Sequence, residues 1–170
     1  MNALTMPSAN RFAPTPESQR SLRDAFGKFS TGVTVVTCAS DKGPVWITAN
    51  SFSSISLDPA LVMWAIGRHS KRFPSFVQAD AFAIHVLAEN QADLCQLAAK
   101  DAYGLRDVPH GLNMAGVPLL DGCLARFECK RSACHSAGDH EIVVGEVLQV
   151  EMRDGAPLAF YAGEFGTITR

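Results

Sequence analysis

Alternation of apolar and polar positions dominates the chain from residue 33 onward and predicts mainly β-strands. Residues 33–38 (VTVVTC) and 45–50 (VWITAN) alternate with a period of two and flank the turn residues 41–44 (DKGP), which is typical of a hairpin. Residues 61–66 (LVMWAI) are apolar at every position, so we expect a strand that is buried on both faces. Further strands are predicted at 82–87, 123–134 and 141–150, and two short ones end the chain. Gly145 inside a strand predicts a bulge or a close backbone approach.

Helical spacing appears in three places. Thr15 can cap a first helix with Pro16 at its first position, and the apolar residues at helical spacing are Leu22, Ala25, Phe26 and Phe29. We expect this helix to pack on the sheet and to end before Gly32. Residues 70–79 and the residues after Asn90 predict two shorter helices.

About seven strands joined by tight turns, with two or three helices, predict an antiparallel β-barrel with peripheral helices. A chain of 170 residues has room for one domain with a sizeable core. We expect residues 1–13 to form a flexible, polar leader and residues 14–170 to form the single domain.

Composition narrows the class of protein. The chain is 47% hydrophobic and 19% charged, which is typical of a globular protein, and its net charge of −2 gives no electrostatic reason to expect nucleic acid or an anionic membrane. The longest apolar run, residues 60–66, is far shorter than the ~20 residues of a membrane span. With no apolar signal segment near the start, a cytoplasmic protein is expected.

The five cysteines predict neither disulfides nor a metal site. Their number is odd and they form no CxxC pair, so reduced thiols are the simplest interpretation. Cys129, Cys134 and His135 invite a metal interpretation, but in a regular strand Cys129 and Cys134 point to opposite faces. We therefore expect the cysteines to pack in the core.

A row of short polar side chains follows the second strand of the hairpin. Six such groups lie within nine positions: Thr48, Asn50, Ser51, Ser53, Ser54 and Ser56. Each is a hydrogen-bond donor or acceptor with little rotamer entropy to lose, so the row is a candidate binding surface. The alternative is an exposed polar strand and a serine-rich turn.

The segment from Gly67 to Arg72 is a candidate phosphate site. It opens a predicted helix with three cations, where the helix dipole disfavours them, and a bound anion would reverse that effect. Gly67, Ser70, Lys71 and Arg72 are the candidate ligands. A solvated charged turn is the alternative.

A third candidate is the turn Gly138-Asp139-His140. Asp139 can hold His140 in one orientation and leave its other ring nitrogen for a ligand, although such a pair is also common on surfaces. His85, within a strand, is expected to be a structural residue. The chain lacks GxGxxG after a strand, GxxxxGKS, HExxH and GxSxG, so the common dinucleotide, P-loop, zinc-protease and hydrolase classes lack their motifs.

The order of motifs resembles the flavin reductase family of the FMN-binding split barrel. The resemblance covers nearly the whole chain, through FGKFSTGVTVVT, ITANSFSSISLDPALV, FAIHVLAENQ, GVPLLDG, GDHEIVVGEV and PLAFYAGEFGT. It implies an antiparallel split barrel of the FMN-binding type. The chain departs from the family at Trp46-Ile47-Thr48, where Gly-Met-Thr is usual, and at the cation-rich HSKR segment.

The resemblance also implies roles for the candidate residues. The segment that contacts the isoalloxazine ring and ribityl chain corresponds to Thr48, Ala49, Asn50, Ser51, Ser53 and Ser54. Ser70 to Arg72 correspond to the phosphate segment, and His140 borders the nicotinamide pocket. Trp46 is expected to change what packs near this site.

The implied activity is an NAD(P)H:flavin oxidoreductase. It transfers hydride from NADH or NADPH to FMN or FAD and supplies the reduced flavin to a partner monooxygenase. A homodimer is implied as well. The alternatives are a split-barrel FMN oxidase of the pyridoxamine-phosphate-oxidase type, a non-catalytic flavin or haem binder, and an electron-transfer protein of the flavoredoxin type.

Overall fold

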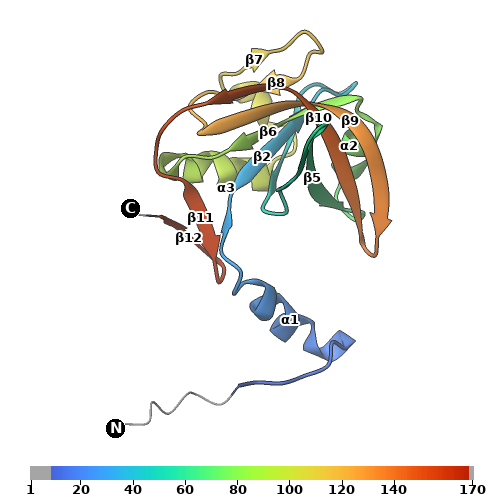
Figure 1. The fold of residues 1–170 in the computed structure, drawn as a ribbon, viewed down its shortest axis with the longest axis vertical. Coiled ribbons are helices and arrows are strands. Elements are labelled where there is room, and N and C mark those ends of the chain that lie inside the picture. Colours follow the sequence, from blue (N-terminus) through green and yellow to red (C-terminus); the bar gives the residue numbers. More distant parts are fainter. Residues whose placement is uncertain (1–8, 169–170) are drawn as a thin grey trace.

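The computed structural model describes residues 9–168 (Figure 1). Its strands are β1 (Thr31–Gly32), β2 (Thr34–Cys38), β3 (Val45–Ala49), β4 (Ser53–Leu57), β5 (Ala60–Gly67), β6 (Ala81–Val86), β7 (Gly111–Leu112), β8 (Pro118–Leu119), β9 (Ala125–Ala137), β10 (His140–Met152), β11 (Leu158–Tyr161) and β12 (Glu164–Thr167). Its helices are α1 (Gln19–Phe26), α2 (Phe73–Gln78) and α3 (Ala92–Lys100), with 3₁₀ turns at Pro16–Ser18, Glu89–Gln91 and Gly104–Asp107.

The predicted mainly β, antiparallel class is confirmed. Seven strands form one sheet in the order β3-β2-β6-β9-β10-β5-β4, and every neighbouring pair is antiparallel. A second sheet has the order β1-β11-β12, and β7 pairs with β8. The large sheet curls around its core while the helices lie outside it, as in a split barrel (Figure 1).

The first hairpin forms as its pattern predicts. Thr34 pairs with Ala49 and Cys38 with Val45, and all five residues of β2 are buried between β3 and β6. The prediction that β5 is buried on both faces is wrong. Val62, Trp64 and Ile66 are buried, whereas the residues between them are only half-buried. The uniform apolar run hides this alternation, because one face of β5 remains partly open to solvent.

The core has two hydrophobic clusters. In the first, α2 places Phe76 edge-on against Trp64, with ring centroids 5.0 Å apart. The second joins α3 to Trp46, Leu87 and Leu158. These two helices thus supply buried side chains to the barrel.

Gly145 lies at a bulge and at a close approach, as predicted. The register between β9 and β10 shifts beside Gly145, and a Cβ there would lie 2.5 Å from Cζ of Phe82. The shift leaves Ser132 of β9 without a pairing partner on β10. Cys129 and Cys134 therefore both contact the first cluster. The prediction that these two cysteines point to opposite faces is wrong. Burial raises the pKa of the Cys129 thiol to about 12, as expected for a thiol that packs in the core.

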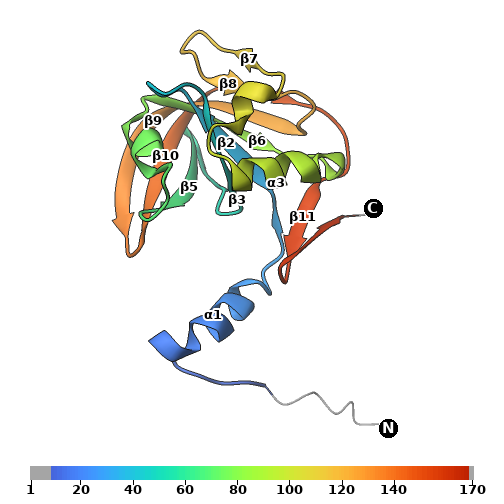
Figure 2. The same ribbon diagram turned by 180° about the vertical axis from the view of Figure 1, so that it is seen from behind.

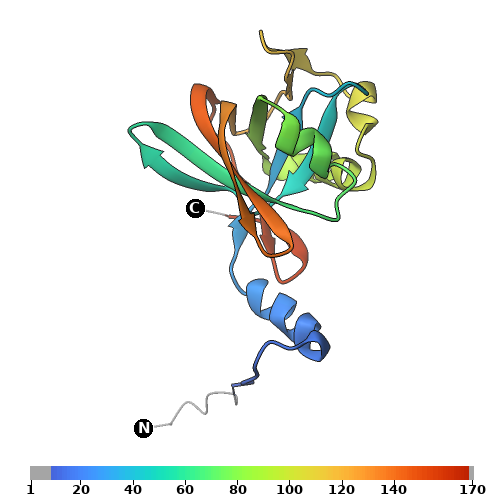
Figure 3. The ribbon, with the colours of Figure 1, turned by 90° about the vertical axis from the view of Figure 1, so that its right-hand side faces the viewer.

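The first helix does not pack on the sheet, which corrects the prediction from its spacing. It stands off the barrel in all three ribbon views (Figures 1, 2 and 3) and buries none of its residues. Phe26 and Phe29 are 69% and 77% exposed. The helix ends at Phe26. The backbone N–H of Ala162 donates to the Gly27 carbonyl (3.0 Å), and this hydrogen bond anchors the C-terminal end of α1 to the β11–β12 turn.

The beginning of the chain is only partly described. Of the predicted leader, residues 1–8 lie outside the described residues, and residues 9–15 contain no helix or strand. Thr15 caps the 3₁₀ turn Pro16–Ser18 that leads into α1, and its backbone N–H donates to the Ser18 hydroxyl (2.8 Å). Within residues 9–168, no helix is long and apolar enough to cross a membrane.

Candidate functional site

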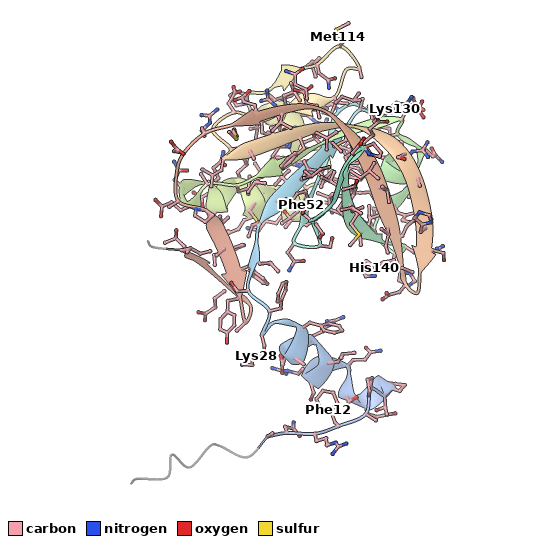
Figure 4. All side chains as sticks on the ribbon, viewed as in Figure 1. Phe12, Lys28, Phe52, Met114, Lys130 and His140 are labelled. Carbon is pink, nitrogen blue, oxygen red and sulfur yellow. The ribbon has the colours of Figure 1, made fainter. Side chains whose placement is uncertain are left out.

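A large cleft separates α1 from the barrel. Its volume is about 1020 Å³, at the upper end of the range for small-molecule sites. One wall is the turn from Asn50 to Ser53, between β3 and β4, and the β11–β12 turn closes one end. The lining residues from α1, β1 and the segment between them are Arg23, Asp24, Phe26, Gly27, Lys28, Phe29 and Thr31. In Figure 4, Phe52 lies on the barrel side and Lys28 lies on the helix side.

A smaller pocket of about 170 Å³ adjoins this main cleft and shares Asn50 and Phe160 with it. Its other lining residues are Val33, Thr48, Ala49 and Phe165. Four residues of the predicted polar row therefore line one or both of these spaces: Thr48, Asn50, Ser51 and Ser53.

Not every hydroxyl of the polar row is available to a ligand. The Thr48 hydroxyl donates to the Cys95 carbonyl (2.9 Å) and so joins β3 to α3. The Ser51 hydroxyl accepts from the Ala65 N–H (2.9 Å) and lies 3.2 Å from the Ala65 carbonyl. Because the pairing of β4 with β5 ends at Met63, Ser51 supplies the hydrogen bonds that a longer β4 would give Ala65.

Asn50 is the polar side chain of this row that is best presented to a ligand. Within residues 9–168 its amide makes no hydrogen bond, and it lines both the main cleft and the small pocket. Ser54 is likewise exposed without a side-chain hydrogen bond in the described structure. The Ser53 hydroxyl donates only to the adjacent Ser54 carbonyl (3.2 Å).

The sequence prediction missed several residues of this cleft. Phe52 stacks on Phe127, with ring centroids 5.5 Å apart, and this contact fixes the turn on the barrel. Thr31 also lines the cleft, and its hydroxyl oxygen is buried without a partner among the described residues. The spacing of α1 could have indicated the cleft, but an amphipathic pattern does not specify which surface its apolar face meets.

The phosphate segment divides into two parts. The Arg72 guanidinium donates to the carbonyls of Ala98 (2.8 Å) and Ala99 (3.3 Å), so it caps the C-terminal end of α3. Its half-buried position lowers its pKa through desolvation, and the charge of Asp101 opposes this shift. Ser70 is half-buried, and its hydroxyl accepts from the Arg72 N–H (3.2 Å). Lys71 is exposed and makes no ion pair within the described residues.

Arg72 can thus contact a phosphate only through its remaining donors. Its Nε is buried and has no partner in the described part of the chain. The phosphate role of Ser70, Lys71 and Arg72 stays a prediction.

The Asp139–His140 pair lies at the exposed tip of the β9–β10 hairpin (Figure 4). Nδ1 of His140 lies 2.7 Å from Oδ1 of Asp139, and this hydrogen bond holds the pKa of the Asp139 carboxyl below its ordinary value. An ionised carboxylate only accepts, so Nδ1 carries the proton. The other ring nitrogen faces Gly67, where a Cβ would lie 3.5 Å from Nε2.

The candidate groups are connected but do not share one pocket. Gly67 pairs with His140 across β5 and β10, and Ala65, which Ser51 holds, is two residues before Gly67. The main cleft and the small pocket are lined by five of the candidate residues: Thr48, Ala49, Asn50, Ser51 and Ser53. The remaining candidates line neither: Ser54, Gly67, Ser70, Lys71, Arg72 and His140.

Two other expectations can be decided. Trp46 is fully buried in the second cluster, where its Nε1–H donates to the Asp101 carbonyl (2.6 Å), so it does not line the site.

His85 is a buried structural residue, as predicted. Its Nδ1–H donates to the Val35 carbonyl (3.0 Å) and its Nε2 accepts from the Leu120 N–H (3.1 Å).

A split barrel with a cleft beside a polar turn defines a class of proteins that bind small ligands or cofactors. The model of the flavin reductase like domain matches residues 26–169. The chain therefore belongs to the flavin reductase family.

Named relatives agree with this family. FMN reductase (NADH) SmoA of Agrobacterium fabrum is 48% identical over 170 residues, which is 100% of this chain and 98% of the relative. The reductase component of the flavin-dependent trigonelline monooxygenase of Acinetobacter baylyi is 41% identical over 150 residues, 87% of this chain, but this chain spans only 48% of that relative. The solved structure of the NADH:FAD oxidoreductase SgcE6 of Streptomyces globisporus has a TM-score of 0.88 at 32% identity, over 99% of this chain and 96% of that chain.

Proposed function

We propose that this protein is an NAD(P)H:flavin oxidoreductase that supplies reduced flavin to a partner monooxygenase. The observation that carries the proposal is the match of residues 26–169 to the flavin reductase family, together with the cleft beside Asn50. The Asn50 amide, which has no hydrogen-bond partner within residues 9–168, fits a polar ligand in that cleft. FMN is the proposed flavin and NADH the proposed donor, because the relative at 48% identity is named an FMN reductase (NADH).

The residues of this chain bind and orient the two cofactors. Hydride passes from the nicotinamide to the oxidised flavin, so the reactive atoms belong to the cofactors and the protein needs no acid–base pair. Asn50 and the backbone of the following turn orient the flavin ring. Ser70 and Lys71 attract its phosphate, and His140 orients the nicotinamide. The protein contributes by holding the two rings at reacting distance.

A homodimer is part of the proposal. An isolated eight-residue helix is unstable in water. Phe26 at the end of α1 and Phe29 in the segment after it are exposed. A second copy that covers this face would stabilise it. Gel filtration at micromolar concentration tests this, and a monomeric mass would contradict it.

The partner and the location are proposed on separate grounds. A relative named as the reductase component of a monooxygenase supports a monooxygenase partner. All five cysteines are free, which is typical of a reducing compartment such as the cytoplasm. The division into a leader of residues 1–13 and one domain of residues 14–170 also stays a prediction.

Steady-state oxidation of NADH with added FMN, FAD or riboflavin tests the proposed activity. We expect NADH consumption that depends on added flavin, and loss of flavin from the protein on desalting. Flavin that stays bound to the protein, together with oxidation of an added substrate to an aldehyde or amine product, would favour the oxidase alternative. Flavin or haem absorbance that NADH does not bleach would favour a binding protein, and reduction only by a protein donor would favour electron transfer.

A further inference from the structure

Arg68 makes four contacts to the tip of the β9–β10 hairpin. Its backbone N–H donates to the Asp139 carbonyl (2.9 Å) and its Nε–H to the His140 carbonyl (3.3 Å). One terminal nitrogen of the guanidinium donates to the Ser136 hydroxyl and to the Glu141 carboxylate, both at 2.6 Å. Arg68 therefore bonds to residues on both sides of the turn that carries His140.

The three side-chain contacts use the geometry of the Arg68 guanidinium and not its charge alone. The planar fork of Arg presents several donors in fixed directions, which an ammonium group cannot do. The partner carboxylate of Glu141 is well shielded, since its side chain is 17% exposed, whereas that of Arg68 is 39% exposed. This ion pair therefore has less solvent screening than a fully exposed one.

The position of Arg68 explains why the contacts affect His140 directly. Arg68 follows Gly67, which pairs with His140 and faces its Nε2. Asp139 sets the proton-bearing nitrogen of the imidazole, but it lies in the same turn and cannot fix that turn relative to β5. The Arg68 side chain supplies this second constraint across β5 and β10.

We propose that Arg68 is a positioning residue for the nicotinamide site, and that it acts by holding the β9–β10 turn so that His140 stays at the end of β5. This inference rests on the proposed function, because it assumes that His140 orients the nicotinamide. Arg68 itself does not contact the cofactor. Its cation is paired with Glu141, so it differs in role from Lys71.

The competing explanation is that Arg68 attracts the phosphates of NADH directly, and three variants separate the two roles. Arg68→Met keeps the length of the stem and removes the donors, and we expect it to raise the KM for NADH about 10-fold through lost orientation. Arg68→Lys keeps the charge and should restore only part of this loss. Glu141→Gln leaves the Arg68 cation unpaired, so positioning predicts a higher KM for NADH and direct attraction predicts a lower one.

The control variant is Arg153→Gln. Arg153 also forms an exposed ion pair, with Glu151 at 3.0 Å, but beyond the far end of β10. It should leave the KM for NADH unchanged. Flavin affinity, measured by fluorescence quenching, should be unchanged in all four variants.

Amide hydrogen exchange of residues 137–141 gives a readout that does not depend on activity. We expect faster exchange in Arg68→Met and Glu141→Gln, and wild-type exchange in Arg153→Gln. The proposed role of Arg68 is overturned if exchange is unchanged in both Arg68→Met and Glu141→Gln. It is also overturned if Glu141→Gln has a lower KM for NADH. If the wild-type protein does not reduce flavin, the proposed function fails instead, and exchange alone decides whether Arg68 holds the turn.

Discussion

Nδ1 of His140 lies 2.7 Å from Oδ1 of Asp139, and Nε2 of the same ring faces the backbone of Gly67. The carboxylate thus sets which ring nitrogen carries the proton, and the strand pairing sets where the other nitrogen points. The first constraint lies within the turn of the β9–β10 hairpin, and the second comes from the pairing of β10 with β5. His140 lines neither the main cleft nor the small pocket beside Asn50, so the proposed nicotinamide and flavin contacts can be tested separately.

His140→Ala should raise the KM for NADH about 10-fold while flavin affinity survives, because only nicotinamide orientation is lost. Asp139→Asn should have a smaller effect in the same direction, since the ring keeps its place but loses its charged partner. Steady-state kinetics and flavin titration measure the two quantities. Loss of flavin binding in His140→Ala would show that the histidine belongs to the flavin site.

Asn50→Ala and Ser51→Ala should separate flavin contact from support of the turn. The Asn50 amide has no partner in the described structure, so we expect its loss to weaken flavin binding about 10-fold without changing the melting temperature. Ser51→Ala removes the partners of Ala65 and should lower the free energy of unfolding by about 1 kcal/mol.

Flavin titration and urea unfolding of both variants measure these effects. The opposite result, a stability loss in Asn50→Ala and none in Ser51→Ala, would reverse the two roles.

Lys71 and Arg72 should also differ. Lys71→Gln should weaken binding of FMN but not of riboflavin, because only FMN carries the phosphate that the free cation attracts. Arg72→Met should lower the free energy of unfolding by about 1 kcal/mol, since the last carbonyls of α3 lose their cap. Titration with both flavins and thermal unfolding provide the data. An equal loss of affinity for FMN and riboflavin in Lys71→Gln would show that Lys71 does not bind the phosphate.

Stability should depend on the protonation of His85. Burial lowers the pKa of His85 from the ordinary value of 6.5 to about 3, so between these values the unfolded chain binds more protons than the folded one. The stabilising contribution is complete above pH 6.5 and decreases as the pH falls toward 3. From about pH 7 to about pH 5, this residue alone should reduce the free energy of unfolding by about 2 kcal/mol.

His85→Gln provides the matched control, because an amide can donate and accept as the neutral ring does. Urea unfolding at both pH values should show a smaller pH dependence in the variant, even if it is less stable at pH 7. Equal pH dependence in the two proteins would show that His85 is not the source.

Local patterns predicted much of the sheet. The hairpin from Thr34 to Ala49 and the bulge at Gly145 depend on turn residues and on the missing Cβ of a single glycine, and both are visible in the sequence. The parity of Cys129 and Cys134 was predicted wrongly because the register shift beside Gly145 leaves Ser132 of β9 unpaired and changes the alternation in β9. The glycine marks the shift in β10, but no residue of β9 itself marks it.

The site was harder to predict than the fold. The row from Thr48 to Ser56 indicates hydrogen-bonding capacity, but contacts with Cys95 and Ala65 decide which groups remain free. Arg72 has the residue type of a phosphate ligand, yet its partners at Ala98 and Ala99 are 26 and 27 positions away. Such long-range contacts depend on packing and not on local pattern.

Anaerobic stopped-flow mixing of the protein and FMN with NADH tests the central claim most directly. The oxidised flavin absorbance should disappear rapidly, only when protein, flavin and NADH are all present, and more slowly when the transferred hydrogen of NADH is replaced by deuterium. Flavin absorbance that persists in the complete mixture would contradict the assignment of this chain as a flavin reductase.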